Sequence, residues 1–208
     1  MSRSLSAPRG ALAALLPLLL AACATTRPAV HNAGDVVTLG QQEQRERALA
    51  DTSHWTLQGK LSVSDGKDSG SGALTWKQDG ERYEFTVRAP VTGRSFRLVG
   101  GPDGADLEGL DGGTRHGPDA ETLMAQAVGW QIPMAELKRW VLGLRADTGP
   151  ADIRFGDDRL PSQLTQDGWV VDYKAWDATH QPPMPSKVFA EKAPLKVRLA
   201  IDTWQLGP

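Results

Sequence analysis

The chain has 208 residues, of which 40% are hydrophobic and 23% are charged, and its formal net charge is −2 at pH 7. This length suits one ordinary domain with its own core, and the slightly acidic balance argues against nucleic acid as a partner, because such proteins carry a basic surface. The 7 Trp, 22 Gly and 14 Pro favour a turn-rich β protein over a helical bundle.

The N-terminus has the layout of a secretory signal. Arg3 and Arg9 precede an apolar run at residues 11–22, and small residues follow at a cleavage zone. The run is shorter than the roughly 20 apolar residues that a bilayer-spanning helix needs, and it contains Pro17. Residues 1–22 are therefore expected to be removed.

Leu20-Ala21-Ala22-Cys23 resembles the lipobox of bacterial lipoproteins, in which the Cys thiol receives a diacylglyceryl group and the new amine is acylated after cleavage. Cys23 is the only cysteine, so an intramolecular disulfide is excluded and an attachment point is its simplest role. More than one acyl chain makes such an anchor stable. Because Ala24 rather than Asp follows Cys23, the resemblance implies the outer membrane, on its periplasmic face. A plain secretory signal is the alternative.

Residues 23–40 have no sustained apolar period and are expected to form a lipidated tether, followed by a domain at residues 41–208. Residues 41–50 are good helix formers but mostly polar, which predicts a surface helix. From Trp55 onward, apolar and polar residues alternate with the period of half-buried strands. One-sided strands linked by turns, as in an antiparallel meander, are expected at 55–64, near 74–76, at 83–89, and around 96–98 and 105–107.

The middle of the chain changes to a helical period. Asp119 is a candidate N-cap and Gly129 a candidate stop for one short helix, while Pro133 and Gly143 bracket a second. Both helices have one apolar face and lie between two blocks of strands. We therefore expect them to cover the sheet as a lid.

The second block predicts weak strands near 153–155 and 160–164 and clearer strands at 169–173 and 195–201, with a proline loop at 182–185. Trp204 breaks the alternation, which predicts a bulge near Asp202 or Thr203. With 10–11 strands of one apolar face each, the expected fold is mainly β with α: an unclosed antiparallel β-barrel, or half-barrel, covered by short helices.

No constellation for catalysis or metal binding is apparent. The four histidines are scattered, and the sequence has neither a glycine-rich phosphate loop nor a G-x-S-x-G turn. We expect no enzyme activity, no metal and no cofactor, although a Ser-His-acid cluster in the folded cleft would revive an envelope hydrolase.

The interior of such a sheet can be filled or hollow, and periodicity does not decide between a packed core and an acyl-binding pocket. If it is a pocket, the candidate lining residues are Leu61, Leu74, Trp76, Phe85, Val87, Phe96, Leu98, Met124, Trp130, Leu137, Trp140, Val141, Trp169, Val171 and Leu199.

The turn Pro90-Val91-Thr92-Gly93 is unusual because it places apolar Val91 at the tip of a hairpin, between Arg88 and Arg94. An exposed valine forgoes roughly 1.5–3 kcal/mol of burial. The turn is a candidate for membrane contact; a Val91 folded back onto the sheet edge is the alternative.

In order and spacing, the chain from Trp55 to Leu206 resembles the LolB family of outer-membrane lipoprotein receptors. The matching segments, besides the lipobox and the turn at 90–93, are Gly59-Lys60-Leu61, Leu74-Thr75-Trp76, Gly129-Trp130-Gln131-Ile132-Pro133, residues 137–143, Gln166-Asp167-Gly168-Trp169, residues 181–185 and Asp202-Thr203-Trp204.

The resemblance implies a half-barrel with a helical lid and a hydrophobic cavity. It implies a monomeric receptor that accepts acylated lipoproteins from the soluble periplasmic carrier LolA and inserts them into the outer membrane without nucleotide hydrolysis. The family's protruding turn typically has Pro-Leu-Gly, with its Leu implicated in delivery, whereas this chain has Val91 and one more residue. The alternative is a structural or assembly lipoprotein whose interior is simply packed.

Overall fold

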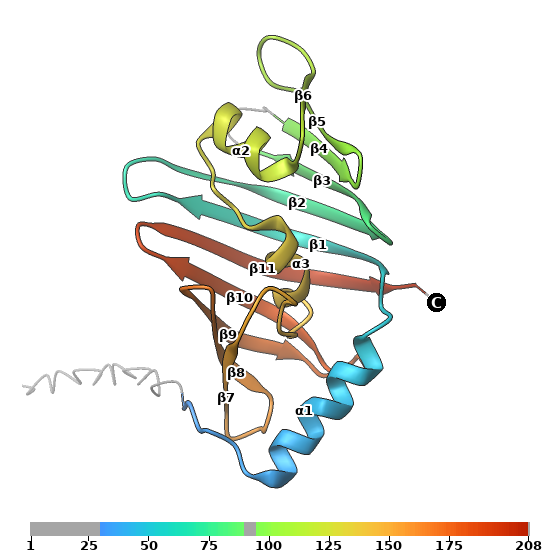
Figure 1. Ribbon diagram of the computed structural model, residues 1–208, viewed down its shortest axis with the longest axis vertical. Coiled ribbons are helices and arrows are strands. Elements are labelled where there is room, and N and C mark those ends of the chain that lie inside the picture. The colour runs from blue at the N-terminus through green and yellow to red at the C-terminus, as the bar shows by residue number, and fades with distance from the viewer. Residues whose placement is uncertain (1–29, 90–94, 208) are drawn as a thin grey trace, which may run out of the picture.

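The computed structural model describes residues 30–89 and 95–207. Its strands form one antiparallel sheet in the order β6-β5-β4-β3-β2-β1-β11-β10-β9-β8-β7, in which β6 and β7 are the two edges (Figure 1). The sheet is therefore open, as the sequence predicts. The strands are β1 (His54–Ser64), β2 (Ser69–Asp79), β3 (Arg82–Arg88), β4 (Ser95–Gly101), β5 (Gly104–Glu108), β6 (Arg115–Gly117), β7 (Ala151–Phe155), β8 (Pro161–Gln166), β9 (Trp169–Asp177), β10 (Met184–Lys192) and β11 (Leu195–Leu206).

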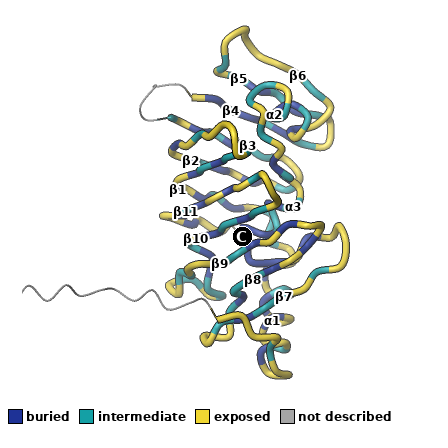
Figure 2. The backbone as a smooth tube through the Cα atoms, turned by 90° about the vertical axis from the view of Figure 1, so that its left-hand side faces the viewer, coloured by how far each residue is buried: buried dark blue, intermediate teal, exposed yellow. Residues whose placement is uncertain are grey.

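Burial alternates along the strands, so the sheet has one apolar face, which we call the inner face (Figure 2). Two short helices, α2 (Ala120–Val128) and α3 (Met134–Trp140), lie over this face (Figure 1). The predicted lid is thus present. Asp119 caps α2, its side chain accepting a hydrogen bond from the Thr122 backbone N–H, and Gly129 ends it in the left-handed region at φ 75°.

The second lid helix is shorter than the sequence suggests. Pro133 is its N-cap rather than its first residue, and residues 141–143 form turns. Val141 and Leu144 are nevertheless fully buried, because the turns keep the apolar stripe directed at the sheet.

Strand β10 is not predicted by the sequence, because Pro182, Pro183 and Pro185 indicate only a loop there. Pro185 lies in β10 at a point where the register with β9 shifts, and such irregularities tolerate a residue without an N–H. The three-residue β6 was also missed, since no alternation is visible over so short a segment.

The helix predicted at residues 41–50 is α1 (Val36–Leu49), which begins five residues earlier than expected. It buries a mostly polar stripe of Thr38, Gln42, Arg45 and Leu49. The Arg45 guanidinium lies 4.6 Å from the centre of the Trp176 ring and donates a 2.7 Å hydrogen bond to the Leu142 carbonyl. Polar contacts, together with Leu49 in the apolar cluster, therefore fix this helix.

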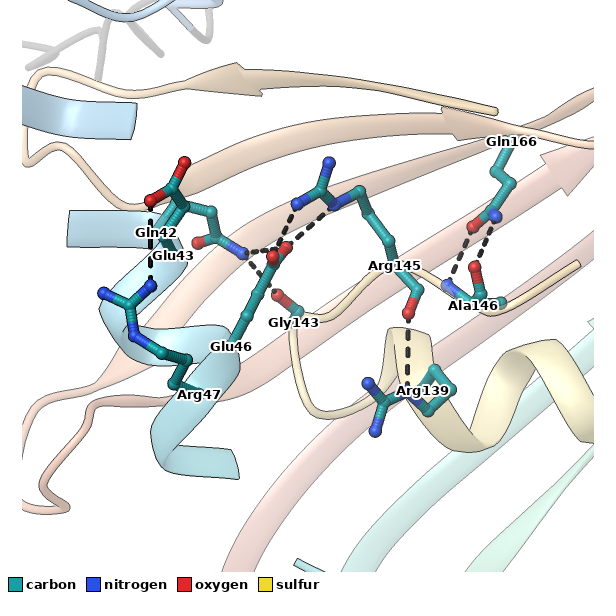
Figure 3. A network of polar contacts seen from close by, with 9 residues as sticks. All are labelled: Gln42, Glu43, Glu46, Arg47, Arg139, Gly143, Arg145, Ala146 and Gln166. Atoms are coloured by element: carbon teal, nitrogen blue, oxygen red, sulfur yellow. Dashed lines mark hydrogen bonds and ion pairs between the residues drawn. The ribbon is translucent and has the colours of Figure 1, made fainter. Parts of the chain in front are cut away.

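A second set of polar contacts joins α1 to the segment that follows α3 (Figure 3). Glu46 accepts a 2.8 Å hydrogen bond from Arg145 Nε, and Gln42 donates to Glu46 at 3.1 Å. Arg139 in turn donates to the Arg145 carbonyl at 3.4 Å. The chain after α3 is thus held from both sides.

The bulge predicted near Asp202 is confirmed: Gln58 pairs with Thr203 and Gly59 with Ile201, so Asp202 is the extra residue. At the same point a Cβ on Gly59 would lie 2.1 Å from the Ala200 carbonyl oxygen. The close approach of the two backbones requires glycine here.

We expect Gly59→Ala to lower the free energy of unfolding by about 2 kcal/mol or more, because backbone atoms of β11 cannot move aside. Urea denaturation measures the change. Gly40→Ala in α1 is the control, since nothing lies within 4 Å of the added methyl, and it should stabilise by up to about 1 kcal/mol. Equal effects of the two substitutions would contradict the packing described.

Candidate functional site

The residues proposed from the sequence to line an acyl pocket are brought together on the inner face and beneath the lid. All except Trp130 are buried, with at most 8% of the surface of each exposed, and all belong to or pack against one continuous apolar cluster. The sequence list omitted equally buried inner-face neighbours. Strand parity alone points to Leu57, Val63 and Leu107, while Met184 and Val188 lie on the missed strand β10.

Aromatic rings fill much of the space between the lid and the sheet. The Trp76 ring centre lies 5.1 Å from that of Trp55 and 5.4 Å from that of Phe85, and Trp140 lies 5.9 Å from Trp169. These are tilted or edge-on contacts of the kind that stabilise cores. With the lid in this position, the side chains of the chain itself occupy the inner face.

An open cavity of about 700 Å³, the mouth cavity, lies at one end of the lid. This volume is within the range of roughly 300–1,000 Å³ of small-molecule sites. Of the sequence candidates, only Trp169 lines it. Its other walls are the α2–α3 linker with the neighbouring part of α2, and two hairpin turns, with the charged groups Asp65, Lys67, Glu121 and Lys192.

The half of the lid formed by α3 is held by polar contacts. Trp140 donates a 3.1 Å hydrogen bond from Nε1 to Gln166, and its carbonyl accepts one of 3.1 Å from the Tyr173 hydroxyl. Gln166, 1% exposed, also exchanges two hydrogen bonds with the backbone of Ala146, of 2.8 and 2.9 Å (Figure 3). Breaking such buried hydrogen bonds leaves groups unsatisfied, which costs about 1–3 kcal/mol each. This half of the lid is therefore fixed to β8 and β9.

The half formed by α2 is held differently. Its buried residues are Ala120, Leu123 and Met124, and between the described residues no hydrogen bond or ion pair joins α2 to a strand. Beyond its end, Trp130 packs edge-on against Phe96, with ring centres 5.9 Å apart, and covers Gly70. Apolar contact, without directional bonds to the strands, therefore attaches this half to the sheet.

Glu121, at the junction of α2 and α3, has a carboxyl whose pKa is raised. The residue as a whole is exposed, but partial burial of its carboxyl is the largest cause that raises the pKa, and the charge of Glu136 adds to it. The backbone N–H groups of Met134 and Ala135, at the start of α3, offset the shift only in part. An ionised Glu121 is thus unfavourable with the lid in place.

The remaining chemistry is sparse. His54 lies 3.0 Å from Asp79 and 3.0 Å from the Ser53 hydroxyl, but this Ser-His-acid group is exposed at the start of β1 and none of its residues lines the mouth cavity. His116 and His180 each lie next to an aspartate, and His31 contacts Ser162, at separate places near the surface. Among residues 30–89 and 95–207, no group of three or more His, Cys, Asp or Glu side chains could hold a metal. None of the described helices is long and apolar enough to cross a bilayer. Cys23 and the turn Pro90, Val91, Thr92 and Gly93 lie outside the described residues.

Comparison with known proteins connects this site to one family. The family model "Outer membrane lipoprotein LolB" matches residues 53–204. The protein "Outer-membrane lipoprotein LolB" of Xanthomonas campestris pv. campestris (strain 8004) is 41% identical over 182 residues, which are 84% of each chain. The protein of that name from Alkalilimnicola ehrlichii is 37% identical over 199 residues, which are 95% of this chain and 96% of the relative.

Solved structures share the fold at low sequence identity. A LolA superfamily protein from Nitrosomonas europaea superimposes with a TM-score of 0.52 at 10% identity, covering 82% of this chain and 94% of its own. A DUF1329 family protein from Desulfovibrio piger gives 0.52 at 6% identity, covering 82% and 92%. At these identities the likeness concerns the fold alone.

The raised pKa of Glu121 predicts a pH dependence of stability. Because the folded state holds this proton more tightly than the unfolded one, the stability that the carboxyl provides is present below about pH 4.5 and is lost as the pH rises through the higher folded pKa. We expect Glu121→Gln to raise the free energy of unfolding relative to the parent more at pH 7 than at pH 4. Denaturation at both values measures this, with the exposed Glu81→Gln as control. A gain that is the same at both pH values, or a loss at pH 7, would contradict the electrostatics described.

Proposed function

The chain belongs to the LolB family of outer-membrane lipoproteins, and from this membership we propose that it is a lipid-anchored receptor that accepts acylated lipoproteins from the periplasmic carrier LolA and inserts them into the outer membrane. The observation that carries the proposal is the unequal attachment of the lid. A continuous apolar interior lies beneath a helix, α2, that is attached to the sheet by apolar contacts.

The proposed mechanism is a movement of α2 while α3 stays fixed. Leu123 and Met124 leave the inner face, and the acyl chains of a lipoprotein take their place against Leu107 and the other buried residues of β4 and β5. Apolar contact is non-directional and scales with buried area, so a hydrocarbon chain replaces an apolar side chain without a lost hydrogen bond. The hydrogen bonds of Gln166 with Trp140 and Ala146, which we call the Gln166 clamp, in contrast hold α3 in place while α2 moves.

Entry is proposed at the mouth cavity. Gly129 ends α2 in a conformation that suits glycine, and Trp130 next to it bridges the lid to Phe96. Displacing Trp130 would join the mouth cavity to the apolar interior. The charged rim then faces the polar part of the bound lipoprotein.

No nucleotide is needed for such a transfer. Acyl chains move from carrier to receptor to bilayer if each binds them more tightly than the one before, and every 1.4 kcal/mol of difference shifts the distribution tenfold. Cys23 is the proposed lipid attachment residue that keeps the receptor at its target. Nothing in the proposed role requires catalysis.

A second candidate function rests on the packed interior. Because aromatic rings already fill the inner face, a structural or assembly lipoprotein with a closed core is the competing assignment. Uptake of an acyl probe distinguishes the two.

We predict that the mature chain, made without its lipid, binds a fluorescent fatty acid and that Trp130→Ala accelerates uptake several-fold, because the bridge from the lid to Phe96 is lost. Stopped-flow fluorescence measures the association rate. Trp176→Ala, which removes a half-buried tryptophan of β9 that contacts Arg45 of α1, is the control and should leave the rate unchanged. Absence of uptake by all three proteins would favour the structural lipoprotein.

We further predict that Val91→Glu leaves acyl uptake intact and slows release into phospholipid vesicles, since a charged tip resists entering lipid. Release is followed by transfer of a fluorescent lipoprotein to vesicles. Val170→Glu, at an exposed valine of β9, is the matched control. Loss of uptake in a normally folded Val91→Glu protein would remove the delivery role from this turn.

A further inference from the structure

Exposed apolar side chains concentrate at one place, the start of α1. Of the six large hydrophobic residues exposed among the described ones, four form this group, which we call the α1 patch: Val30, Val36, Val37 and Leu39. Val36 is 86% exposed and Val37 55% exposed. The other two, Val170 and Leu206, lie on separate strands. Single exposed hydrophobic residues are ordinary, whereas a contiguous group indicates a contact surface.

The patch belongs to the outer side of a helix whose inner side is already satisfied. Thr38, Gln42 and Arg45 are buried on the inner side, whereas Val36 and Leu39, three residues apart, are neighbours on the helix surface. Gly40, one turn after Val36, has no heavy atom within 4 Å of the place where a Cβ would lie. Within the described chain, Val36 and Val37 keep more than half of their surface exposed.

The chain before the patch is fixed to the sheet edge. Asn32 exchanges two backbone hydrogen bonds of 2.8 Å with Phe155 of β7, and His31 lies 2.8 Å from the Ser162 hydroxyl. Figure 1 shows this segment, the start of α1 and β7 together at one end of the molecule. The position of Val30 relative to the domain is therefore set.

This attachment shortens the distance to the membrane. Only six residues lie between Cys23 and Val30, so the seven steps from one to the other span at most about 25 Å. If Cys23 carries the lipid, as the proposed function has it, the α1 patch belongs to the part of the described domain nearest the bilayer by chain connection. A surface so close to lipid needs no further partner to be covered.

We propose that the α1 patch rests on the phospholipid surface of the membrane that holds the anchor, and that this second contact orients the domain. The inference depends on the proposed lipid attachment and goes beyond it, because an acyl anchor alone fixes no orientation. The contact is apolar rather than electrostatic. The charged groups Asp157, Asp158 and Asp35 are acidic and do not attract anionic lipid. Asp157 and Asp158 lie exposed in the turn after β7. Hydrogen bonding from Thr38, with a smaller contribution from the charge of Arg159, lowers the pKa of Asp35, which lies beside the patch. We therefore expect the contact to persist at high salt.

The test uses the full lipidated chain in vesicles of phosphatidylethanolamine and phosphatidylglycerol. With the Cys23 thiol acylated, Val37→Cys provides one reactive thiol for an environment-sensitive fluorophore. Gln44→Cys, exposed further along α1, and Val170→Cys on β9 are matched controls. We expect a nitroxide in the lipid phase to quench the label at position 37 at least about twofold more than either control, at low and at high salt. Adding Val36→Ser and Leu39→Ser should reduce quenching to the control level.

The proposal is overturned if the label at position 37 is quenched by lipid nitroxide no more than the controls and remains open to aqueous iodide. It is also overturned if the label is protected from iodide without vesicles, since a second protein copy would then cover the patch. Failure of the lipid attachment itself is recognised separately, because Cys23 would then take up label and the protein would not float with the vesicles.

Discussion

The constraint on which the rest depends is that an antiparallel sheet with one apolar face must have that face covered. In this chain the sheet has eleven strands and stays open, with β6 and β7 unpaired with each other, so its curvature alone does not close the interior. The lid supplies the cover in two halves that are attached to the sheet differently: α3 through buried hydrogen bonds at Gln166 and Tyr173, and α2 through apolar side chains. A receptor for acyl chains requires an apolar cover that the acyl chains can displace.

Much of this architecture follows from local sequence patterns. The alternation from Trp55 to Val63, the cap at Asp119 and the parity break at Trp204 each determine a local geometry, and the structure has them where expected. The sequence pattern did not predict the elements whose formation does not depend on side-chain periodicity. Strand β10 depends on its neighbours β9 and β11 and tolerates Pro185, and α1 is held by Arg45 and Gln42, whose polarity suggested a solvated helix.

The residues of the candidate site likewise fall into those that could be identified from the sequence and those that could not. Inward-facing residues such as Leu74, Phe85 and Leu98 could be named from the sequence, because burial on a strand has a period of two. The Gln166 clamp could not, since a buried glutamine among polar neighbours has no signature and its partners Trp140 and Ala146 lie 20 or more residues away along the chain. The difference between the two halves of the lid, on which the proposed mechanism rests, exists only in three dimensions.

The most direct test of this account is photo-crosslinking of a lipoprotein whose acyl chains carry a photoreactive group, transferred from loaded LolA to the receptor and mapped by mass spectrometry. The account predicts adducts on inner-face residues beneath α2, among them Leu98, Ala105 and Leu107, which are buried with the lid in place. Adducts confined to exposed residues, with the inner face unmodified after complete transfer, would contradict it.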